Sequence, residues 1–213
     1  MNKGKKLHGN KETVVKVCNW LSLPLQALGC CILYLVIEAF SRHSLAAAWS
    51  YMVESPWVFL YNAFLIFTTF MVVYLFRRRV LVRLIMSCFW LLLGIINGVI
   101  LANRVTPFTG PDLRNLSDGA KVVTKYLSKG TMILVAAALV ALLAFFVWVW
   151  IKGPKFQGKI RWYLNVPLIA LVIVLFTGAT NLALAKRVLS SYFVNIAFAY
   201  QDYGYPYCLA VTL

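Results

Sequence analysis

Five long apolar stretches divide the chain, and most of the segments between them are basic. The stretches cover about residues 20–40, 56–76, 84–102, 131–151 and 166–185. Each holds about 20 residues, which as a helix rising roughly 1.5 Å per residue is long enough to cross about 30 Å of hydrocarbon. The pattern therefore predicts an all-α fold: a polytopic membrane bundle with five transmembrane helices.

The longest polar interruption, residues 103–129, has a pattern of its own. One side of an expected helix carries apolar residues and the other carries cations, namely Leu113, Leu116 and Val123 against Arg114, Lys121 and Lys125. Gly110-Pro111-Asp112 is typical of a helix start. We expect an amphipathic helix over 111–128 that lies in the headgroup layer between the third and fourth spans. A solvated connecting helix is the alternative.

Composition agrees with a membrane protein. Of the 213 residues 62% are hydrophobic and 13% are charged, and the mean hydropathy is +0.80, which excludes an ordinary soluble domain. The net charge of +15 would indicate nucleic acid as a partner of a soluble chain, but these cations flank apolar stretches, so we expect no nucleic acid. The five scattered cysteines and the isolated His8 and His43, both in expected loops, predict neither a disulfide framework nor a metal site.

The positions of the cations predict the topology. The basic tail 1–18 and the segments 77–83 and 152–161 together hold 13 of the 21 Lys and Arg residues, and the alternate segments hold the other eight. Because cations accumulate in cytoplasmic loops, we expect the N-terminus to be cytoplasmic, and the C-terminus and the segment 103–129 to be extracytoplasmic.

A few polar residues and glycines interrupt the apolar stretches. Glu38 is expected either to reach water at the interface or to pair with Arg42 one helical turn later or with a cation of residues 103–129. Asn97 and Asn181 are expected to form hydrogen bonds between helices. Gly94 and Gly98 have the spacing that allows two helices to approach closely, and we interpret them as packing within the molecule.

Residues 186–213 are rich in tyrosine and stop within an apolar stretch. We expect an extracytoplasmic linker, truncated before a further domain. Two motifs carry a resemblance: Arg104-Val105-Thr106-Pro107-Phe108 followed by Asp112-Leu113, and residues 195–208, NIAFAYQDYGYPYC. Together with five spans and an internal N-terminus, they resemble the membrane portion of the lipoteichoic acid synthase family of Gram-positive bacteria.

The resemblance implies that an extracellular, sulfatase-like domain follows the spans. In that family this domain holds manganese and a threonine nucleophile that takes glycerol phosphate from phosphatidylglycerol. No residue of this chain matches the nucleophile or the metal ligands, and no metalloprotease motif is present, so the chain alone is expected to be inactive and without a cofactor.

The expected role is to anchor that domain and to present phosphatidylglycerol to it. Cations at headgroup height suit a lipid phosphate, so the candidate lipid-binding residues are Arg104, Thr106, Asp112, Arg114, Lys121 and Lys125, with Thr106 and Asp112 shaping the turn. Expected partners are membrane lipids, the following catalytic domain and cell-envelope machinery. Pure anchoring, or a small scaffold or transporter subunit without a catalytic domain, remains the alternative.

Overall fold

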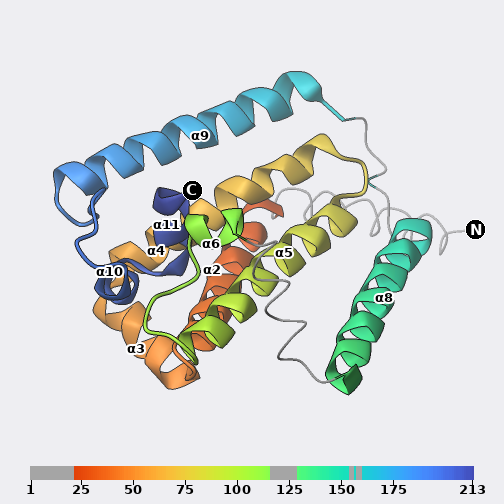
Figure 1. The fold of residues 1–213 in the computed structure, drawn as a ribbon. Helices are drawn as coiled ribbons and strands as arrows, with labels where there is room; N and C mark the ends of the chain where they lie inside the picture. Colours follow the sequence, from red (N-terminus) through yellow and green to blue (C-terminus); the bar gives the residue numbers. More distant parts are fainter. Residues whose placement is uncertain (1–21, 116–128, 154–155, 157–159) are drawn as a thin grey trace, which may run out of the picture.

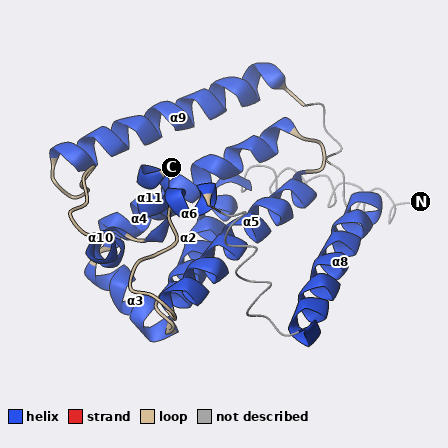
Figure 2. Cartoon of the chain, in the orientation of Figure 1, coloured by secondary structure: helices blue, strands red, loops and turns tan. Residues whose placement is uncertain are grey.

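The computed structural model describes residues 22–115, 129–153, 156 and 160–213. Within these residues the secondary structure is entirely helical (Figure 2). The helices are α2 (Ser22–Ser41), α3 (Leu45–Glu54), α4 (Pro56–Phe70), α5 (Arg79–Leu101), α6 (Gly110–Arg114), α8 (Lys129–Lys152), α9 (Trp162–Ala185), α10 (Ile196–Tyr203) and α11 (Tyr205–Thr212). A 3-10 turn, η1 (Met71–Leu75), continues α4.

Four helices are long and apolar enough to cross a membrane: α2, α4 with η1, α5 and α9. They coincide with the first, second, third and fifth predicted spans. The fourth, 131–151, corresponds to α8, whose apolar stretch within the described side chains is the shorter Val140–Lys152. The all-helical fold is thus confirmed and the four apolar helices support a membrane protein, whereas the count of five spans stays a prediction. So does the amphipathic helix, because only its first turn, α6, lies within the described residues.

Helix α2 packs against both α4 and α5, and α9 lies along α4 (Figure 1). Two glycines on α5 allow the α2 contact: a Cβ at Gly94 would lie 3.1 Å from the side chain of Ile37, and one at Gly98 would lie 2.7 Å from the carbonyl oxygen of Phe40. The predicted intramolecular use of this glycine pair is therefore confirmed. Absence of a side chain is what brings the two helix backbones together.

The outward faces of these helices remain apolar. On α9 the exposed fractions of Leu171 and Val174 are 54% and 66%, and on α2 those of Leu25 and Ile32 are 57% and 55%. Such faces would be unfavourable in water and match hydrocarbon. They support the assignment of a membrane protein independently of helix length.

The two ends of the helix bundle differ, and one of them is formed by the basic loops. At one end the backbone N–H of Phe156 donates to the carbonyl of Arg77 (2.8 Å), and the Asn165 amide donates to the carbonyl of Tyr74 (2.8 Å). The two basic loops therefore meet, as alternate crossing requires, and we call this the basic end. The prediction that it faces the cytoplasm rests on the charge bias.

The opposite end carries a cap, which we define as α3, the loop 102–109, α6, α10 and α11 (Figure 1). Two parts of it differ from the sequence-based expectation. The expected loop after the first span contains α3, which Ser44 caps by accepting from the N–H of Ala47 (3.3 Å). The expected linker over 186–213 contains α10 and α11, and Tyr205, Tyr207 and Cys208 are buried there.

The α2–α5 contact yields a test. Gly98→Ala should lower the free energy of unfolding by about 1–3 kcal/mol, because the new methyl group would overlap the Phe40 carbonyl. Gly178→Ala on α9 is the control, since nothing lies within 4 Å of that position. The measurement is the unfolding of both variants in detergent micelles, followed by circular dichroism. Equal stability of the two variants would contradict the close contact.

Candidate functional site

A buried ion pair joins the first span to the C-terminal helices. Glu38 is fully buried, and its Oε2 accepts from Arg42 Nε at 3.0 Å, one helical turn later. Its Oε1 accepts from the backbone N–H of Tyr205, also at 3.0 Å. The predicted pairing with Arg42 is confirmed, and the alternative of a glutamate that reaches water is wrong. A buried carboxylate needs this full set of partners, because it has lost its hydration.

Arg42 connects this pair to the rest of the cap. Its Nη2 donates to the carbonyl of Gln201 (2.9 Å), and its guanidinium lies 4.0 Å from the centroid of the Tyr51 ring. Burial opposes the charge of Arg42, but the Glu38 carboxylate overcomes this and raises the pKa of Arg42 above its ordinary value. The arginine therefore stays charged and links α2, α3 and α10.

A second buried side chain fixes the turn between α10 and α11. The Asn62 amide, fully buried on α4, donates to the carbonyl of Tyr203 (2.8 Å) and accepts from the N–H of Tyr207 (2.8 Å). Gly204 lies between them with φ +78°, and a Cβ there would lie 2.2 Å from the Tyr34 hydroxyl. Only glycine fits this left-handed and crowded position. The turn is thus bound by Glu38 and Asn62 together.

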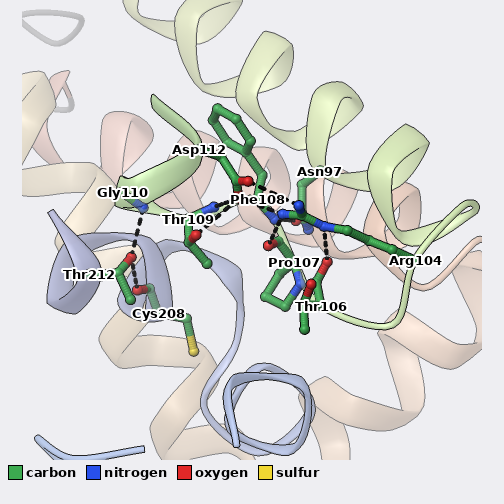
Figure 3. A network of polar contacts seen from close by, with 10 residues as sticks. All are labelled: Asn97, Arg104, Thr106, Pro107, Phe108, Thr109, Gly110, Asp112, Cys208 and Thr212. Carbon is green, nitrogen blue, oxygen red and sulfur yellow. Dashed lines mark hydrogen bonds and ion pairs between the residues drawn. The ribbon is translucent and has the colours of Figure 1, made fainter. Parts of the chain in front are cut away.

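Asn97 ties the third span to the loop that follows it. Its amide donates to the Ser41 hydroxyl (2.9 Å), and its oxygen accepts from the N–H of Phe108 (2.8 Å; Figure 3). The prediction of a hydrogen bond between helices is confirmed for Asn97. Asn181, for which the same role is predicted, is exposed on α9.

Arg104 organises the loop 102–109 (Figure 3). Its guanidinium donates to the carbonyls of Thr106 (2.9 Å) and Pro107 (2.8 Å) and pairs with both oxygens of Asp112. Asp112 also accepts from the N–H and the hydroxyl of Thr109, at 2.8 and 2.9 Å, in a capping box that starts α6. The hydrogen bond from Arg104 holds the pKa of Asp112 below its ordinary value. The Asp112 side chain shapes the turn, as predicted, whereas Thr106 contributes its backbone carbonyl.

The short helix α6 packs against the end of α11. The N–H of Gly110 donates to the Thr212 hydroxyl (3.0 Å), and Arg114 Nη2 donates to the carbonyl of Leu213 (3.1 Å). Of the candidate lipid-binding residues, Arg104, Thr106 and Asp112 therefore come together, while Arg114 lies at a separate contact. Lys121 and Lys125 lie outside the described residues.

A pocket of about 420 Å³ opens between the two arginine clusters, and we call it the cap pocket. Arg42 and Arg104 line it with polar groups of neighbouring elements and an apolar wall, the other lining residues being Ser41, His43, Ala47, Leu101, Val105, Tyr200 and Gln201. Both arginines already have carboxylate partners. The pocket therefore offers hydrogen-bonding groups with little net charge.

Sequence reasoning missed Arg42 and Asn62 as site residues. The signal for Arg42 was its i, i+4 spacing from Glu38, which indicated an ion pair without its wider role. The signal for Asn62 was a lone amide inside an apolar span, where an unpaired polar group is costly. Nothing local indicated that both would bind residues 201–207.

Within the described part of the chain, no group of three or more His, Cys, Asp or Glu residues is placed to hold a metal ion. Cys30, Cys31, Cys88 and Cys208 are free thiols. The site can bind and position a ligand, and its polar groups also hold the elements of the cap together.

Comparisons with family models, curated proteins and solved structures find no match. The site geometry and the sequence motifs therefore carry the functional argument.

The buried Glu38–Arg42 pair predicts that a nearly isosteric substitution of Glu38 has a large effect on stability. Glu38→Gln should lower the free energy of unfolding by about 2–3 kcal/mol, because Arg42 would lose its counter-charge in a largely desolvated place. Glu54→Gln makes the same chemical change at an exposed position and should be neutral. Thermal unfolding of the two variants in micelles tests this. A stable Glu38→Gln protein would show that the pair is dispensable.

Proposed function

We propose that this chain is the membrane module of a phosphoglycerol transferase that resembles lipoteichoic acid synthases. In this proposal it lies in the cell membrane with a cytoplasmic N-terminus, anchors an extracellular catalytic domain that follows residue 213, and presents phosphatidylglycerol to that domain. The observation that carries the proposal is that both motifs of the resemblance line one pocket: Arg104 and Val105 come from the first, and Tyr200 and Gln201 from the second.

The anchoring role is supported by how the C-terminal segment is held. Glu38 and Asn62, on two different apolar helices, bind the backbone of residues 203–207 through three hydrogen bonds, two of them buried. A domain that follows this segment would have a fixed starting point at the membrane surface. Such fixed placement raises the effective concentration of a catalytic site near its lipid substrate, because less conformational freedom is lost on encounter.

The lipid-presenting role is supported by the place and lining of the cap pocket. It lies where α2 and α5 end, and its wall includes the apolar Leu101 and Val105, the latter 79% exposed. In this proposal the headgroup of the lipid binds the guanidinium and hydroxyl groups of the cap pocket, while the acyl chains of the lipid lie along the apolar helices. Lys121 and Lys125 are expected to supply further cations at the same height. The nucleophile and the manganese would belong to the following domain.

The natural reading frame gives the first test. We expect it to continue past residue 213 into a sulfatase-like domain, and the full-length protein to release diacylglycerol from phosphatidylglycerol in a metal-dependent way. A stop codon at this point would favour a membrane scaffold instead.

Lipid presentation gives the second test, which needs only this chain. Ala47→Leu places a larger side chain in the cap pocket without removing a charge, and it should weaken phosphatidylglycerol binding roughly tenfold, or about 1.4 kcal/mol. Ala46→Leu on the same helix is the control, because Ala46 does not line the pocket. Native mass spectrometry of the protein titrated with phosphatidylglycerol measures both. Equal binding by the two variants would contradict the assignment of the headgroup to this pocket.

A further inference from the structure

A second pocket lies at the basic end, far from the cap. It has a volume of about 400 Å³ and lies between the start of α2, the end of α4 and the start of α5. We call it the basic-end pocket. Its polar lining comes from Ser22, Gln26, Arg83 and Ser87, and its apolar lining includes Leu25 and Phe70. No part of the function proposed above uses it.

Two hydrogen-bond donors of this pocket lack partners. Gln26 is 6% exposed, and its Oε1 accepts from Arg83 Nε at 3.2 Å, which orients the amide. Among the described residues, neither Gln26 Nε2 nor Arg83 Nη2 has a hydrogen-bond partner, although both atoms are buried. Buried donors without acceptors are costly. Since both groups line the same pocket, an acceptor bound there would satisfy them together.

The charge of this end favours an anion as that acceptor. Four arginines gather here: Arg77, Arg78, Arg79 and Arg83. The carboxylates of the described residues all lie toward the cap: Glu38, Glu54, Asp112 and Asp202. Arg78 and Arg79 have their guanidinium groups over the rings of Trp150 (4.6 Å) and Phe156 (3.8 Å). Aromatic contacts hold them in place without neutralising them, so the end keeps a positive potential.

The walls of the pocket indicate a lipid as the source of the anion. Leu25 lines the pocket and is also 57% exposed on the apolar outer face of α2, so the pocket borders the surface that faces hydrocarbon. A phosphate held by Arg83 and Gln26 would have its acyl chains beside this face. A soluble phosphate would gain nothing from these apolar walls.

We infer that the basic-end pocket binds the phosphate of an anionic phospholipid, with Arg83 and Gln26 as the donors. This lipid lies in the leaflet opposite to that of the cap pocket. The inference therefore does not rest on the proposed transferase function, and either can fail without the other.

The test uses the full chain, delipidated in detergent and titrated with dioleoyl phosphatidylglycerol under native mass spectrometry. Arg83→Gln and Gln26→Leu should each lower the affinity at least tenfold, because each removes a donor to the phosphate. Arg77→Gln is the matched control: it removes the same charge at the same end from an exposed residue outside the pocket, and it should change the affinity less than twofold. All of these variants are made in an Ala47→Leu background, which fills the cap pocket, so that the titration reports binding at the basic-end pocket.

Gln26→Glu guards against a loss of folding, because the new carboxylate would pair with Arg83 and keep the helices together. It should also abolish binding of the anionic lipid. Equal losses for Arg77→Gln and Arg83→Gln would overturn the inference in favour of diffuse attraction. Inorganic phosphate that binds as tightly as the lipid would overturn the assignment to a phospholipid, and unchanged affinity in all three pocket variants would overturn the site itself.

Discussion

The carboxylate of Glu38 accepts a hydrogen bond from Arg42 on one oxygen and from the backbone of Tyr205 on the other. A carboxylate with no exposed surface is costly unless every oxygen has a partner, so α2 can carry this residue only while the C-terminal segment is docked. The docking of α10 and α11 depends on the carboxylate in the same way. The cap, its pocket and the path of the chain toward residue 213 all follow from this mutual requirement.

The same rule explains the other polar residues inside the spans. The amides of Asn62 and Asn97 are fully buried, and each binds backbone groups of a segment outside its own helix. Hydrocarbon offers no hydrogen bonds, so a polar side chain within a span must find its partners in the protein. Here those partners are the loop 102–109 and the turn at Gly204. Glu38, Asn62 and Asn97 therefore mark the places where the cap binds.

Local patterns in the sequence predicted the local features. The spans follow from apolar length, the Glu38–Arg42 pair from its i, i+4 spacing, and the contact at Gly94 and Gly98 from the glycine spacing. The cap could not be predicted in this way. The bond from Tyr205 to Glu38 joins residues 167 positions apart, and the one from Tyr207 to Asn62 joins residues 145 apart. The two C-terminal helices have only eight residues each, too few to show a helical period clearly.

Only the part of the candidate site that is local in sequence could be predicted. Arg104, Thr106 and Asp112 lie within nine residues of one another, so a shared turn was visible in the sequence. The pocket beside them needs Arg42 and Tyr200, which only the folded cap brings close. Lipid binding by these residues stays a prediction, as do the amphipathic helix and its lysines.

Hydrogen exchange of the turn between α10 and α11 tests the central claim most directly. The account predicts that the backbone amides of Tyr205 and Tyr207, measured on the chain in lipid nanodiscs, exchange as slowly as the amides of α4, because buried side chains of α2 and α4 hold them. Exchange at the rate of an unstructured peptide would show that residues 186–213 form a free linker, and the account would be wrong.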